Sequence, residues 1–118
     1  HPQPRAFAGL VYNDPALMNE TMAALERTRH ALEAAGIRFI VVALPMMSGL
    51  RDEVYPYSLV LNRLIIACKQ RGLEVLDLRD DFLGRDDRAL WVHPTDQHPN
   101  DIGQRLLGEG IVRYLKQP

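Results

Sequence analysis

The sequence is poor in features that mark several common classes of protein. A single cysteine, Cys68, excludes a disulfide within the chain. No apolar run approaches the roughly 18 residues of a membrane-spanning helix, so no membrane span is expected. Neither sign of charge dominates, because 14 Lys and Arg residues stand against 15 Asp and Glu residues. Without a basic stretch, nucleic acid is not an expected partner.

Three stretches carry the periodicity of amphipathic helices. In the first, apolar residues recur from Met18 to Leu32 at helical spacing, with charged residues between them. Asp14 and Pro15 suit the N-cap and the first helical position, and Gly36 suits the end of the helix. The predicted helices span residues 15–35, 56–71 and 100–116.

The second and third helices each present one apolar face. Such a face is expected to pack against a core, and Cys68 is expected to be a small buried apolar residue within it. The inner face of the second helix comprises Leu59, Leu61, Leu64, Ile65 and Cys68. The stripe of the third helix comprises Ile102, Leu106, Leu107, Ile111, Tyr114 and Leu115.

Two stretches between the helices predict β-strands. Residues 37–44 and, more briefly, residues 73–78 are nearly continuous in apolar side chains, as in parallel strands buried on both faces. The alternation of helix and strand predicts an α/β fold with parallel strands and right-handed crossovers. Residues 1–14 are expected to be irregular or to form one short element. With two strands only, strand 37–44 would keep an open apolar edge, which favours pairing with a further strand.

The segment WVHPTDQHPN, residues 91–100, is crowded with polar groups. Asp96 and His98 are two positions apart, so their side chains point to the same side of an extended backbone. A carboxylate placed there can fix the tautomer of the imidazole and stabilise its protonated form, as a general base requires. Pro99 restricts the backbone of His98, and Asn100 suits the N-cap of the last helix.

Two other interpretations of this segment stay open. In the first, Asp96 and Asn100 are only turn and cap residues, and the histidines are incidental. In the second, His93, Asp96 and His98 bind a metal ion, although no fourth ligand is evident nearby.

The stretch DQHPNDIGQRLLGEGIVRYL, residues 96–115, resembles the last signature block of the SGNH/GDSL hydrolases. There an Asp shortly before His-Pro-Asn precedes a Gly and the C-terminal helix; the spacing here is Asp-x-His, one residue shorter than the commoner form. The resemblance covers residues 16–117 and implies a three-layer α/β/α, flavodoxin-like fold. It also implies ester hydrolysis through a Ser–His–Asp triad, with His98 as general base, Asp96 as its orienting carboxylate and no cofactor. Small-molecule, carbohydrate or lipid esters are the substrates it implies.

The nucleophile departs from the family pattern. The family's serine lies in a Gly-Asp-Ser motif after the first strand, whereas the two serines here, Ser48 and Ser58, have no such context. The stretch VYND, residues 11–14, resembles the block whose Asn donates to the oxyanion, which makes Asn13 a candidate donor. Trp91 and His93 are candidate residues of the substrate pocket.

These observations predict that residues 1–118 are the C-terminal portion of one SGNH-type domain. The N-terminal strands and the serine are expected to lie outside this sequence. Such a portion would be inactive alone and would associate with its other half, or with a second copy, through the strand edge. A non-catalytic α/β binding module is the alternative.

Overall fold

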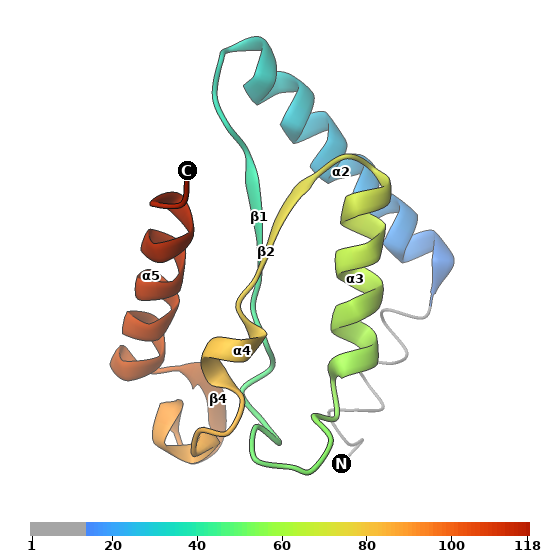
Figure 1. The fold of residues 1–118 in the computed structure, drawn as a ribbon. Helices are drawn as coiled ribbons and strands as arrows, with labels where there is room; N and C mark the ends of the chain where they lie inside the picture. Colours follow the sequence, from blue (N-terminus) through green and yellow to red (C-terminus); the bar gives the residue numbers. More distant parts are fainter. Residues whose placement is uncertain (1–13) are drawn as a thin grey trace. The chain divides into compact units, whose positions relative to one another are not determined.

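Residues 14–118 are described by the computed structural model, and they form a mixed α/β structure (Figure 1). Two strands form a small parallel sheet and two others form an antiparallel hairpin. The elements are α2 (Pro15–Ala34), β1 (Ile40–Ala43), α3 (Ser58–Gln70), β2 (Glu74–Asp77), α4 (Arg79–Phe82), the 3-10 turn η1 (Asp87–Leu90), β3 (Trp91–His93), β4 (Asp96–Pro99) and α5 (Asp101–Leu115). The predicted α/β class is confirmed for these residues, while the short element considered before residue 14 lies outside them.

Contacts divide the described residues into two compact units. The first unit comprises residues 14–42 and 57–75, and the second comprises residues 43–56 and 76–118.

The first unit is built around one apolar cluster. Met22 of α2, Cys68 of α3 and Leu73 are its buried members, and neighbouring apolar side chains of both helices and both strands pack against them. Cys68 has no exposed surface, as expected, and burial raises the pKa of its thiol. Because α2 and α3 both contribute side chains to this cluster, they belong to the same unit, and they lie side by side in Figure 1.

The ends of α2 follow the sequence signals closely. The carboxylate of Asp14 accepts the backbone N–H of Ala16 at 2.9 Å, and Pro15 occupies the first helical position. After Ala34 the chain turns at Gly36, whose φ of 72° is a conformation that residues with a Cβ rarely adopt.

Three features of the prediction are wrong in detail. Both parallel strands are shorter than predicted, and Ile37 and Leu44, which flank β1, are half exposed. Leu59, predicted to lie on the inner face of its helix, is 62% exposed, whereas Leu61 is buried. The last helix buries Leu107 but leaves Ile102 and Leu115 exposed at its two ends. Helical periodicity predicts which side of a helix is apolar, but which of those residues become buried depends on what packs against the helix.

The second unit contains α4, η1, the hairpin and α5, and its largest fully buried side chain is Phe82. Close helix packing depends on Gly110 of α5, because a Cβ there would lie 2.7 Å from Leu78 Cδ2. Nearby, the Arg113 guanidinium donates to both carboxylate oxygens of Asp81 at 2.7 and 2.8 Å and so joins α5 to α4.

The hairpin β3–β4 is not among the elements predicted from the sequence. No strand is predicted for residues 91–99, but Trp91 pairs with Pro99 and His93 pairs with Asp96 across a tight turn. The candidate site is therefore carried on an extended, hydrogen-bonded ribbon.

Candidate functional site

Asn100 fixes the point where the hairpin passes into α5. Its side-chain oxygen accepts the backbone N–H groups of Ile102 and Gly103, both at 3.0 Å, which is the N-cap arrangement predicted from the sequence. Its side-chain nitrogen donates to the carbonyl oxygens of Ala89 at 2.9 Å and Trp91 at 3.2 Å. One side chain thus ties the start of α5 to η1 and β3.

Gly103 allows β4 to approach α5 closely. It is buried, and a Cβ at this position would lie 2.8 Å from the Cβ of Pro99. Pro99, Asn100 and Gly103 therefore have direct structural roles in positioning the residue before them, His98.

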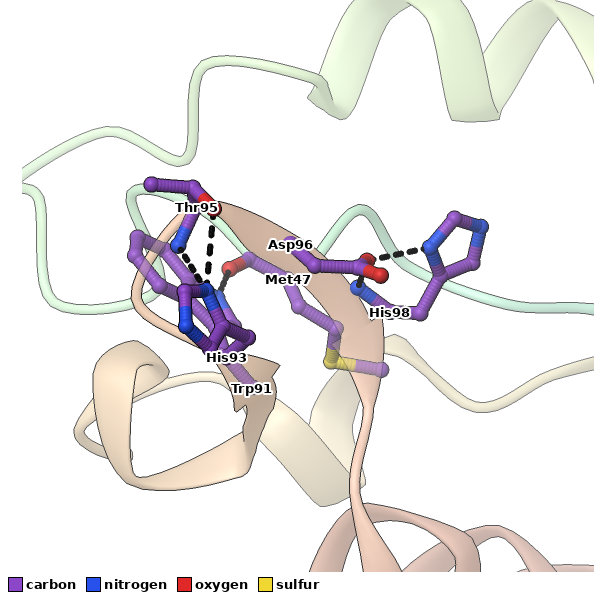
Figure 2. A network of polar contacts seen from close by, with 6 residues as sticks. All are labelled: Met47, Trp91, His93, Thr95, Asp96 and His98. Carbon is purple, nitrogen blue, oxygen red and sulfur yellow. Dashed lines mark hydrogen bonds and ion pairs between the residues drawn. The ribbon is translucent and has the colours of Figure 1, made fainter.

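Asp96 and His98 form the predicted pair on β4. Asp96 Oδ1 lies 2.5 Å from Nδ1 of the His98 ring and also accepts the backbone N–H of His98 at 3.0 Å. Figure 2 shows the carboxylate directed at both groups. The backbone bond is the one that an aspartate in a purely structural turn makes. The bond to the ring goes beyond that requirement, and it selects the tautomer with its proton on Nδ1 and its lone pair on Nε2.

The pair lies at the protein surface. The His98 side chain is 86% exposed and the Asp96 side chain is 47% exposed. The pKa of the Asp96 carboxyl lies below its ordinary value, first because the His98 backbone N–H donates to it and second because the His98 ring does. The carboxylate consequently stays charged beside the imidazole, while the exposed face of the ring keeps Nε2 accessible.

His93 takes part in a separate arrangement at the turn. Its Nδ1 accepts the backbone N–H of Thr95 at 3.2 Å and lies 2.9 Å from the Thr95 hydroxyl (Figure 2). Through these two contacts the His93 ring stabilises the turn between β3 and β4.

An open hollow of about 410 Å³ lies against the pair. It is lined by Leu44, Pro45, Met46, Met47, Thr95, Asp96, Gln97, His98 and Pro99. The first four of these follow β1 directly, where the loops of open α/β sheets commonly bind ligands. Trp91 and His93, the candidate pocket residues, are not part of this lining. Trp91 is bonded to one of the lining residues, because its indole N–H donates to the carbonyl oxygen of Met47 (Figure 2).

Other candidates are not brought to this hollow. Ser48 lies in the loop after Met47 without lining it, and Ser58 begins α3. Asn13 lies outside the described residues. Among residues 14–118, no three His, Cys, Asp or Glu side chains are grouped so that they could hold a metal ion, so the alternative trio that includes His93 is not assembled.

Comparison with known proteins returned no relative. No protein-family model matches the chain, and neither a curated protein nor a solved structure does. Within residues 14–118, none of the helices has the length and apolarity needed to cross a membrane.

Proposed function

We propose that this chain carries the acid–base half of a serine ester hydrolase of the SGNH/GDSL type. The observation that carries the proposal is the bond from the His98 ring to Asp96 in front of a hollow. The same block of sequence supplies the Asp96–His98 pair, the N-cap of α5 at Asn100 and the glycine at position 103. The wider fold would be the three-layer, flavodoxin-like arrangement of that family.

In this mechanism Nε2 of His98 accepts the proton of a hydroxyl nucleophile as the hydroxyl attacks the ester carbonyl. The proton then passes from Nε2 to the leaving alcohol, and the acyl group stays on the nucleophile. Nε2 next accepts a proton from a water molecule that attacks this acyl group, and returns the proton to the nucleophile as the acid leaves. Asp96 holds Nδ1 throughout, and its negative charge stabilises the transient imidazolium. The depressed pKa of Asp96 keeps that charge in place over this cycle.

The proposal places the nucleophilic serine outside residues 1–118, in the Gly-Asp-Ser block that the family carries N-terminal to this region. It is supported by the positions of Ser48 and Ser58, neither of which lines the hollow. Residues 1–118 alone should therefore show only weak activation of water by His98.

The test compares His98→Ala with the unmodified protein, both carrying the upstream sequence. Turnover of a short aryl ester should fall by about a thousandfold or more, because the triad base is lost. His30→Ala, which removes an exposed histidine of α2, is the matched control and should leave turnover unchanged. A rate that survives His98→Ala would refute the proposal.

The exposure of the pair favours a second candidate, the non-catalytic binding module. An imidazole 86% exposed lacks the shielding that strengthens electrostatic catalysis in closed sites. In a binding module the hollow would bind a ligand without turnover. The assay of His98→Ala against the unmodified protein and His30→Ala distinguishes the two functions, because only a hydrolase would show turnover that depends on His98.

A further inference from the structure

The hollow beside His98 has two chemically different walls. Residues 44–47, all apolar, form one wall, and residues 95–99 of the turn and β4 form the other. Among residues 14–118, the only ionisable side chains in the lining are those of Asp96 and His98. A ligand in the hollow would therefore meet polar groups on one side and hydrocarbon on the other.

Backbone hydrogen bonds hold the apolar wall in place. The Tyr55 hydroxyl donates to the carbonyl oxygen of Met46 at 2.8 Å, and the Trp91 indole donates to that of Met47. Two residues further on, the backbone N–H of Gly49 donates to the Asp87 carboxylate at 2.9 Å. A wall that is fixed before a ligand arrives does not have to be ordered on binding.

Two side chains of this wall are apolar and open to solvent. Leu44 is 48% exposed and Met46 is 44% exposed, whereas Met47 is buried. A volume of about 410 Å³ is at the small end of the range for ligand pockets. A long lipid chain would extend beyond that space, and the side chains of residues 44–47 offer the hydroxyls of a sugar no hydrogen-bonding partners.

We infer that the wall at residues 44–47 binds the short, uncharged acyl group of the ester, and that Leu44 and Met46 determine its length. The identity of the ligand as an ester rests on the proposed function, whereas binding of a short apolar chain rests on the hollow alone. The acyl carbonyl would then lie toward β4 and His98.

Binding can be measured on the 118-residue chain labelled with ¹³C in its methionine methyl groups, with methyl butanoate as the probe. The sequence has four methionines, and Met18 and Met22 on α2 serve as internal controls. Resonances of Met46 and Met47 should shift saturably while those of the controls stay in place. Shifts in all four methyl groups, or in none, would overturn the inference.

Variants test whether the wall sets acyl length. Met46→Glu places a charge in the hollow, and it should abolish the methyl shift of Met47; Leu59→Ala, at an exposed leucine of α3, should leave it unchanged. In the hydrolase, each buried methylene contributes about fourfold in binding. In Met46→Glu, the preference in kcat/KM for butanoyl over acetyl esters should therefore fall by about tenfold. An unchanged preference would contradict the inference.

The outcomes separate this inference from the proposed function. If His98→Ala abolishes hydrolysis but Met46 and Met47 show no butanoate-ester shift, the acyl site is wrong and the hydrolase stands. If the shifts appear but hydrolysis does not depend on His98, the hollow is a binding site and the hydrolase is wrong.

Discussion

Replacement of Asn100 should separate two contributions that one side chain makes to stability. Asn100→Ala removes the N-cap of α5, which contributes about 1 kcal/mol. It also removes donors to the carbonyl oxygens of Ala89 and Trp91, each worth about 1 kcal/mol net, less where water can replace them. We expect a total loss of about 2 to 3 kcal/mol, which is a large part of the stability of a small protein.

Asn100→Ser isolates the cap, because a serine hydroxyl can accept the N–H groups of Ile102 and Gly103 but cannot reach both carbonyls. Asn100→Ser should lower the free energy of unfolding by about 1 to 2 kcal/mol. This loss is smaller than that of Asn100→Ala by about the free energy that the N-cap contributes. Gln104→Ala, at an exposed amide of the same helix, is the control and should change stability by less than about 0.5 kcal/mol.

Urea unfolding followed by the fluorescence of Trp91, the single tryptophan, gives these free energies from the transition midpoint and slope. Equal losses in Asn100→Ala and Asn100→Ser would show that the cap contributes nothing. Losses in both variants no larger than in the Gln104→Ala control would refute the assignment of Asn100 as the anchor of the hairpin.

Two further predictions concern the same region. Gly103→Ala should destabilise by about 1 to 3 kcal/mol, since its Cβ would meet that of Pro99 at 2.8 Å, whereas Gly108→Ala on the same helix enters open space and should stabilise by up to about 1 kcal/mol. Urea midpoints that move in the same direction for both would contradict this. Because the folded pKa of Asp96 is depressed, its contribution is fully present above the unfolded value of about 3.9 and is lost as pH falls through the folded value. Asp96→Asn should therefore flatten the fall in stability below about pH 4, measured as urea midpoints against pH, and an unchanged slope would count against the two His98 bonds.

The helices were predicted well because their periodicity and their caps depend on residues close in sequence. Asp14 and Asn100 cap their helices as expected, and the three bonds that they accept join groups two or three positions apart. The geometry of Asp96 with His98 is equally local, so the alternation of an extended chain was enough to predict it.

The hairpin could not be predicted from the same kind of signal. Its strands have three and four residues, and prolines lie in the turn and at the end of β4, which argues against strands. Contacts distant in sequence decide the matter, since Trp91 donates to Met47 across 44 positions and Asn100 N–H donates to Leu90 O at 2.7 Å. The hollow was missed for the same reason, because its two walls come from segments about fifty positions apart.

The wall of the hollow is tied through its main chain, and this has a consequence for how such a site can diversify. Tyr55 and Trp91 hold the carbonyl oxygens of Met46 and Met47, which every amino acid possesses, so neither bond depends on which side chain occupies position 46. Mutations there can accumulate without refolding the loop, while Asp96 and His98 stay in place on a separate strand. Under the proposed function, descendants of one ancestral chain would in this way keep the Asp96–His98 pair and differ in the molecules they accept.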